Sequence, residues 1–232
     1  MSSGMKQSQQ AIYNETLELL DEIRSKVWLA DGMADHGYND DSWTFAETLA
    51  STAHDLSRVR VVAEANQLGA TDAFNRLFER AWPHFQWAMQ TSIDHLQGQT
   101  GFLELLGLHE ARLNGNGTSL IAKPDKNDKV EPTLNWLDNF YDVALNHPEI
   151  AATLTENNVP PEKLAKHAAR VQDLKQAQRH KEQAITAKHE AVEERNEAFE
   201  RLRLWLRRAQ RTARTVRKEQ AAQKKTSISI EL

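Results

Sequence analysis

The sequence predicts an all-α protein: an elongated, coiled-coil-like helical bundle built on one very long C-terminal helix. Three observations lead to this fold class. Nine glycines and six prolines are few for 232 residues, and sparse helix breakers favour long helices over many short strands. Apolar residues recur at spacings of three and four along most of the chain, as they do on the buried face of a helix. Between Glu162 and Gln223 the chain contains neither glycine nor proline.

Residues 1–113 are expected to form an N-terminal helical segment with three long helices and one short helix. The first helix should end at Asp31-Gly32, where the pattern gives way to a polar turn. Asp41 or Ser42 would cap the second helix, and Gly69 would separate the second helix from the third. The expected helical ranges are about 9–29, 42–66, 72–96 and 101–106.

The third of these helices carries the broadest apolar stripe in the sequence. Its aromatic side chains would most simply build a bundle core, and a pocket for a cofactor or an apolar ligand is the alternative. Trp87 lies off the main stripe, and Pro83 inside the helix should kink it by removing a backbone hydrogen bond. The stripe consists of Phe74, Leu77, Phe78, Ala81, Trp82, Phe85, Met89, Ile93 and Leu96.

The second half of the chain begins with the clearest loop. Residues 114–131 are rich in Asn, Gly, Lys and Asp and are expected to form a polar linker. The C-terminal helical segment, 132–225, should hold two shorter helices and then the long helix 161–222, with a proline in its first turn. In the tail, 226–232, isoleucines alternate with other residues, which suggests an extended segment.

A strict seven-residue repeat runs along the long helix. Seven of the eight residues at this step are apolar, which is typical of a helix that packs along its length in a bundle or coiled coil. Between Lys175 and Glu190 the stripe thins, and Ile185 is the only large apolar residue there. The repeat predicts a self-association seam formed by Leu164, Val171, Ile185, Val192, Phe199 and Leu206.

Charge is unevenly distributed along the chain. The net charge is −4, yet residues 201–225 hold ten basic residues and one acidic residue, Glu219. This basic end would bind an anionic partner such as nucleic acid, or it would lie against the acidic part of the same chain. The basic ridge consists of Arg203, Arg207, Arg208, Arg211, Arg214 and Arg217.

Several classes of site have no support in the sequence. The absence of cysteine excludes disulfides, thiolate metal sites and cysteine nucleophiles, and it fits a cytoplasmic protein. Residues 1–10 lack the apolar region of a secretory signal, and no apolar run is long enough to span a membrane. The chain has no Glu-x-x-His pair, phosphate-binding loop or nucleophile elbow. We therefore assign no catalytic, cofactor-binding or metal-binding residue.

Some segments show a distant likeness to known sequences. They include Phe140-Tyr141 before a turn that ends in proline, the turn at 154–159, and a Leu-Glu-Leu-Leu-Gly-Leu segment at 103–108. In these features the chain resembles a group of uncharacterised bacterial helical-bundle proteins, whose last helix usually ends in a Leu-Glu-Leu-Gly type of segment. This chain ends differently, and a diverged duplication of one helical unit would explain the segment at 103–108. The resemblance implies a helical bundle and no activity. It continues in Arg195, Ala198, Leu202, Trp205, Ala209 and Arg214.

Three functional hypotheses follow. The first is a non-enzymatic structural or protein-interaction protein that associates with itself or with a helical partner. The second is a nucleic-acid-binding module that uses the basic ridge. The third is a helical bundle that binds a small apolar ligand beside Trp82 and Trp87.

Overall fold

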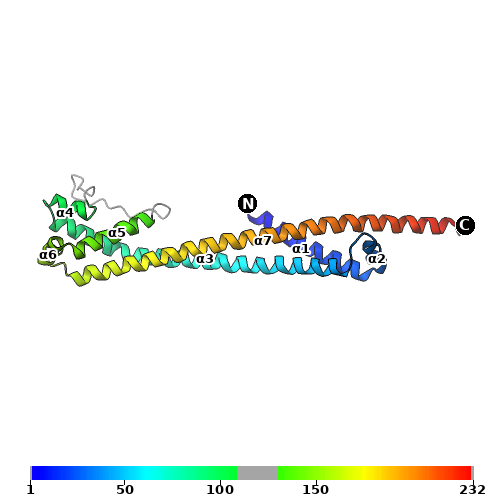
Figure 1. Ribbon diagram of the computed structural model, residues 1–232, viewed down its shortest axis with the longest axis horizontal. Coiled ribbons are helices and arrows are strands. Elements are labelled where there is room, and N and C mark those ends of the chain that lie inside the picture. The colour runs from blue at the N-terminus through cyan, green and yellow to red at the C-terminus, as the bar shows by residue number, and fades with distance from the viewer. Residues whose placement is uncertain (1, 109–129, 231–232) are drawn as a thin grey trace. The chain divides into compact units, whose positions relative to one another are not determined.

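The computed structural model describes residues 2–108 and 130–230, with side chains at 9–108 and 130–224. Within these ranges all regular structure is helical, which confirms the all-α fold class (Figure 1). The long C-terminal helix is also confirmed: α7 runs unbroken over Pro161–Ile230, 70 residues. A second long helix, α3, covers Asp40–His95, 56 residues. The others are α1 (Ser2–Ser25), α2 (Val27–Asp35), α4 (Thr100–Leu105), α5 (Val130–Asn146) and α6 (Pro148–Glu156).

Contacts divide the chain into two compact units, and each unit is discontinuous in sequence. The terminal unit comprises residues 1–65 and 186–232, and the middle unit comprises residues 66–185. Helices α3 and α7 contribute to both units. This division differs from the sequence-based one at 114–131, because within each unit part of α3 packs with a part of α7 that is distant in sequence.

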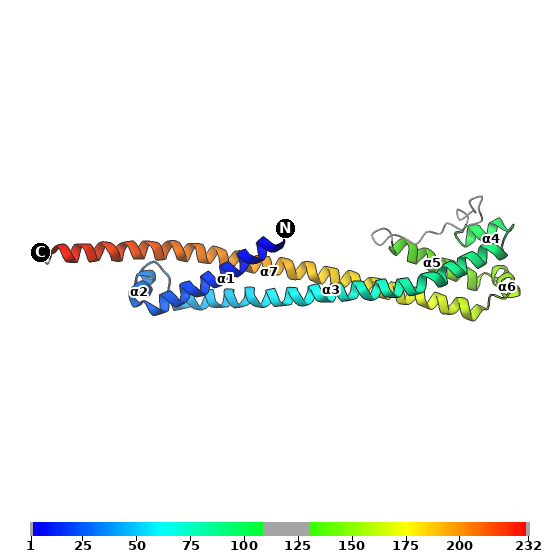
Figure 2. The ribbon, with the colours of Figure 1, turned by 180° about the vertical axis from the view of Figure 1, so that it is seen from behind.

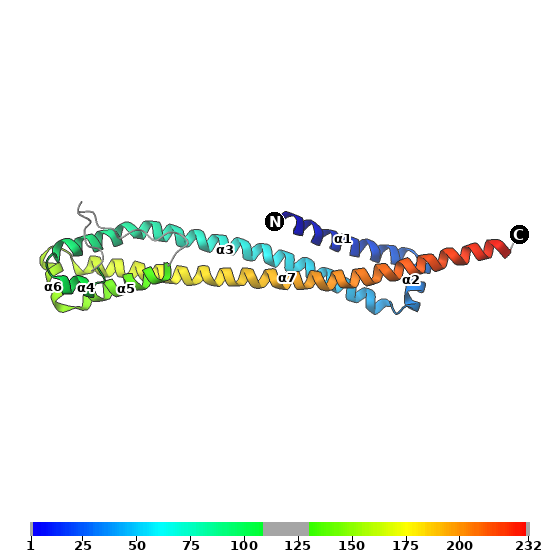
Figure 3. The same ribbon diagram turned by 90° about the horizontal axis from the view of Figure 1, so that it is seen from above.

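The terminal unit is built from α1, α2, the N-terminal part of α3 and the C-terminal part of α7. Figure 3 shows α1 lying beside α7 in this unit. Tyr38, Trp43 and Trp205 form an aromatic group next to the core, with ring centroids 5.6–6.4 Å apart. The main core consists of Leu19, Leu20, Ile23, Leu29, Met33, Trp43, Ala46, Leu206, Ala209, Ala213 and Val216. A smaller cluster joins α3 to α7 through Ala50, Ala53, Ala198, Phe199 and Leu202.

The middle unit packs α4, α5 and α6 against the C-terminal part of α3 and the N-terminal part of α7 (Figure 2). Its largest buried side chains include Phe85 of α3 and Phe140 and Tyr141 of α5, each no more than 1% exposed. Asn158 ends α6 in the left-handed conformation, with φ 62°, which asparagine adopts more readily than most residues. The chain then turns into α7 at Pro160-Pro161, as the sequence predicts.

The start of the chain differs from the prediction of one helix over 9–29. Helix α1 ends at Ser25, Lys26 takes an extended conformation, and α2 follows. Because of this break, Leu29 and Met33 pack into the same core as Leu20 of α1. Gly32, predicted to stop the helix, lies inside α2, where a Cβ atom would come within 2.4 Å of Val216 Cγ1. Its role is therefore close packing between α2 and α7.

The predicted break at Gly69 is wrong, and so is the count of three long helices in residues 1–113. Gly69 lies inside α3, which also continues through Pro83. A glycine in a helix interior costs only about 1 kcal/mol of stability relative to alanine. The parts of α3 before and after Gly69 are packed into cores, and this packing outweighs the cost. The helix start was also misplaced: Asn39 caps α3, because its Oδ1 accepts a hydrogen bond from the Ser42 backbone N–H at 3.2 Å.

Two predicted boundaries need further correction. The linker was expected to end at residue 131, but α5 already begins at Val130. Residues 114–129 lie outside the described residues. The tail was expected to be extended from residue 226, but α7 continues to Ile230. When the helix continues, each further backbone N–H donates a hydrogen bond within the helix. In a short extended segment without a neighbouring strand, these groups could bond only to water.

The middle parts of both long helices contain no buried residue. In α7 this stretch lies between Leu174 and Ala191, and in α3 it lies between Ala53 and Ala70. In α7 this stretch matches the thinning of the apolar stripe at 175–190 in the sequence. The division between the two units at residues 65–66 and 185–186 falls inside these stretches.

Candidate functional site

The predicted basic ridge lies on the terminal unit, and its central residues lie on the side of α7 opposite the buried stripe. That stripe runs from Leu206 to Val216 and packs against α1, α2 and α3. Successive helical residues are about 100° apart, so a second set of residues projects to the other side. We call this set the basic face: Arg207, Arg211, Arg214 and Lys218, all exposed. None of the four forms an ion pair with a carboxylate in the described part of the chain.

Arginines at the edges of the basic ridge form ion pairs within the chain. Arg203 pairs with Glu200 at 3.1 Å on the same helix, and Arg217 pairs with Glu22 of α1. A hydrogen bond from Lys26 lowers the pKa of Glu22, and the charge of Arg217 adds to this effect. Gln210 also donates a hydrogen bond to Glu15 of α1 at 3.2 Å. The acidic part of the chain therefore holds the edge of the ridge and leaves the basic face, with its neighbour Arg208, exposed.

The predicted self-association seam is largely enclosed by the chain itself. Leu164 and Val171 are buried in the core of the middle unit, and Phe199 and Leu206 are buried in the terminal unit. Ile185 and Val192 are half-buried. Side chains already covered by neighbouring helices cannot also cover a second copy, so self-association would need another surface.

The aromatic stripe of α3 mostly forms the core of the middle unit. Trp82 is 4% exposed, stacks on Phe78 and meets Phe85 edge-on. Trp87 is half-buried at the edge of this core, with the Lys163 ammonium 3.3 Å from its ring centroid. A hollow of about 520 Å³ lies beside Pro83 and Trp87, and its walls also include polar side chains of α3. The apolar-ligand hypothesis at this place stays a prediction.

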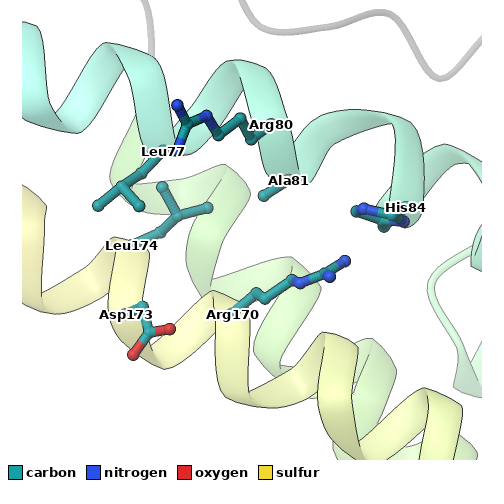
Figure 4. Close-up of a pocket in the computed structure, with 7 residues that line it drawn as sticks. All are labelled: Leu77, Arg80, Ala81, His84, Arg170, Asp173 and Leu174. Carbon is teal, nitrogen blue, oxygen red and sulfur yellow. The ribbon is translucent and has the colours of Figure 1, made fainter.

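A second basic site, which the sequence pattern did not predict, lies within the middle unit. It is a cavity of about 400 Å³ between α3 and α7. In Figure 4 the side chains of His84 and Arg170 point toward one another across it, and Asp173 points away from α3. The lining residues are Leu77, Arg80, Ala81 and His84 from α3 and Arg170, Asp173 and Leu174 from α7.

Buried polar groups lie next to His84 at one end of this cavity. The rings of His84 and His167 lie 5.1 Å apart, and Tyr141 meets His167 edge-on at 6.3 Å. His167 is 3% exposed and Tyr141 is 1% exposed. Among the described residues, no hydrogen-bond partner serves His167 Nδ1, the Tyr141 hydroxyl or one terminal nitrogen of Arg170. Buried polar atoms are usually paired, so this concentration calls for an explanation.

Burial and positive charge set the protonation of the two histidines. Burial lowers the pKa of His167 to about 4, and the charges of Arg170 and nearby groups add to the shift. Burial, then Arg170, Lys163 and Lys166, also lower the pKa of His84. Both rings are therefore neutral at pH 7, and the positive charge of the cavity comes from its arginines.

One signal in the sequence could have pointed to this cavity. Lys163, Lys166, His167 and Arg170 follow one another at helical spacing, so they share one side of α7. Their partner His84 could not be recognised, because the register of α3 against α7 is a property of the folded unit.

Comparisons with known proteins do not assign this chain to a family. No protein-family model matches it, and no curated protein or solved structure is significantly similar to it. Within the described residues, no group of three or more His, Asp or Glu side chains is arranged to hold a metal ion. No helix in the same residues has the length and apolar character that a membrane span requires. The function must therefore be argued from the surfaces of the two units.

Proposed function

We propose that this chain is a non-enzymatic interaction protein and that the basic face of α7 binds duplex DNA. One observation carries the proposal: Arg207, Arg211, Arg214 and Lys218 are exposed on one side of a helix, without carboxylate partners in the described residues. Guanidinium and ammonium groups in such a row are suited to successive phosphates. At about 1.5 Å per residue the face extends over about 16 Å, enough to contact several phosphates of a duplex.

The burial of the apolar stripe favours a nucleic acid over a membrane surface. A basic amphipathic helix binds a bilayer by inserting its apolar side between the lipids. In α7 the apolar side from Leu206 to Val216 is already buried in the core of the terminal unit. Only the charged side remains for a partner, which supports contact with phosphate groups alone and thus little sequence preference.

Fluorescence anisotropy with a labelled duplex tests this function. Four phosphate contacts predict that the association constant falls about 100-fold between about 50 and 200 mM salt. Replacing Arg207, Arg211 and Arg214 together with Glu should reduce binding at low salt by at least about 100-fold, because three contacts are lost and repulsion is added.

The matched control makes the same charge change elsewhere. Replacing Arg58, Arg76 and Arg179, all exposed, with Glu should leave most of the binding intact. If both triple variants weaken binding equally, net charge rather than the basic face is responsible. No binding by the unaltered protein at low salt would remove the proposal.

A second candidate is self-association, favoured by exposed apolar residues on α3. Phe45, Val59 and Val62 are 56%, 50% and 59% exposed within the terminal unit. A second copy packed there would remove this apolar surface from water. Sedimentation velocity at micromolar concentration should then show a dimer that dissociates when Val59 and Val62 are replaced by Lys. The control replaces Val27, 72% exposed on α2, with Lys; a monomer at all concentrations would exclude this candidate.

A further inference from the structure

We propose that the cavity between α3 and α7 in the middle unit binds a small organic anion that has an oxyanion head group and an apolar body. The cavity has two chemically different ends. Leu77, Ala81 and Leu174 supply the apolar part of the lining, beside which the Arg80 side chain extends, and Arg170 and His84 face one another at a basic end (Figure 4). This proposal concerns the middle unit and does not rest on DNA binding by the terminal unit.

The size of the cavity fits such a ligand. Pockets for small molecules have volumes of roughly 300–1,000 Å³ and combine apolar walls with a few polar groups that fix orientation. At about 400 Å³ this cavity is at the lower end of that range. It suits a compact molecule, such as one aromatic ring with a charged substituent.

The unsatisfied arginine argues for an anion. One terminal nitrogen of Arg170 is buried without a hydrogen-bond partner in the described residues, and leaving such a donor unpaired is costly. A carboxylate or phosphate would accept two parallel hydrogen bonds from the guanidinium group. The Asp173 side chain points away from α3, so it does not take this place (Figure 4).

The surroundings strengthen the same preference. Arg80 also lines the cavity, and the charges of Lys163 and Lys166 act on the neighbouring His84. The neutral ring of His84 can donate a hydrogen bond to an oxyanion from one nitrogen. His167 packs beside this ring, and Tyr141 packs against His167. Positive charge, a neutral donor and an apolar end are what an amphipathic anion requires.

The experiment compares four probes by NMR, with the methyl groups of Leu77 and Leu174 as reporters. Phenyl phosphate and benzoate carry both a ring and an oxyanion, inorganic phosphate lacks the ring, and benzyl alcohol lacks the charge. We expect phenyl phosphate or benzoate to shift both methyl signals and to bind at least about tenfold more tightly than benzyl alcohol and inorganic phosphate. Whichever of the two binds more tightly identifies the preferred head group.

Two substitutions on α7 make the test specific. Arg170→Met should weaken binding of the better probe by about tenfold or more, and Arg179→Met, at an exposed position on the same helix, should not change it. If Arg170→Met disturbs folding, Arg170→Lys keeps a charge but loses the bidentate geometry and should still weaken binding. DNA binding should be unaffected by either change at Arg170, so the two proposals can fail independently.

Three results would overturn the proposal. One is the absence of methyl shifts with phenyl phosphate and benzoate up to millimolar concentration. Another is equally tight binding of benzyl alcohol, which would show an apolar pocket without preference for charge. The last is unchanged binding of the anions to a folded Arg170→Met or Arg170→Lys variant.

Discussion

Two parts of α7, one near its start and one ending at Val216, are packed into cores, whereas the stretch between these packed ends is not. Near the start of the helix, Leu164, Val171 and Leu174 are buried in the middle unit, and from Ala198 to Val216 a second stripe is buried in the terminal unit. Between Leu174 and Ala191 no residue is buried. Propensity alone stabilises a helix only marginally in water, so the packed ends must hold the middle.

This contrast shows how one helix can serve two separate structures. Each packed end has its own charged surface: the exposed basic face in the terminal unit and the basic cavity in the middle unit. The basic face is exposed to solvent, and its position follows directly from the order of residues along α7. The basic cavity depends on the packing of α3 against α7. Stability should therefore be sensitive to changes at the packed ends and insensitive to changes between them.

The largest effect is expected for a core truncation at a packed end. Leu202 is fully buried between α3 and α7, so Leu202→Ala should lower the free energy of unfolding by about 2–5 kcal/mol. The matched change in the middle, Ile185→Ala, should cost less than about 1 kcal/mol, because Ile185 is only half-buried. Urea unfolding measures both. Equal losses would contradict the distinction between ends and middle.

Acid should selectively weaken the middle unit through His167. Burial lowers its pKa in the folded state to about 4, below an ordinary value of about 6.5 in the unfolded chain. The unfolded chain thus takes up the proton first, and stability falls as pH drops from about 6.5 to about 4. The loss should reach about 3 kcal/mol.

Urea unfolding at neutral pH and near pH 4 tests this effect in variants. His167→Gln should remove most of the loss due to this residue, and His180→Gln, at an exposed position, should not. The carboxylates titrate alike in both variants, so their contribution cancels in the comparison. An unchanged acid dependence in His167→Gln would contradict the assigned burial.

Replacing two glycines with alanine should have smaller effects on stability, and these effects should differ between a packed and an unpacked part of a helix. Gly32→Ala should destabilise the terminal unit by about 1–3 kcal/mol, because its Cβ would lie 2.4 Å from Val216 Cγ1. Val216→Ala in the same chain should relieve this penalty. Gly69→Ala should instead stabilise by about 0.5–1 kcal/mol, since nothing lies within 4 Å of the new atom. Thermal unfolding checks all three; destabilisation by Gly69→Ala would show that α3 is packed there.

A charge in the middle of α7 is also expected to have a small effect on stability. Ile185→Asp should lower the free energy of unfolding by about 1 kcal/mol, similar to Ile185→Ala, because Ile185 is only half-buried. Sedimentation velocity of the same variant tests whether this stretch contributes to a dimer. Weakened self-association would mean that a second copy covers it.

Much of the fold, but little of the packing, could be predicted from the sequence. The absence of breakers after Pro161 was sufficient for α7, and the thin apolar stripe around Ile185 identified its unpacked middle. The predicted helix breaks at Gly32 and Gly69 were wrong. A glycine permits a break without requiring one, and the contacts of the neighbouring residues determine whether the helix continues. The basic face follows from helical spacing. The cavity at Arg170 does not, since it needs α3 and α7 side by side in one register.

Hydrogen exchange along α7 separates its packed ends from its unpacked middle. We expect slow exchange at residues 164–174 and 198–216, which the two cores protect, and faster exchange at 175–190, where local opening exposes no buried side chain. The measurement should be made at low protein concentration, so that self-association does not add protection. Exchange in the middle as slow as at both ends would show that this stretch is packed, because such protection requires a core that continues through residues 175–190.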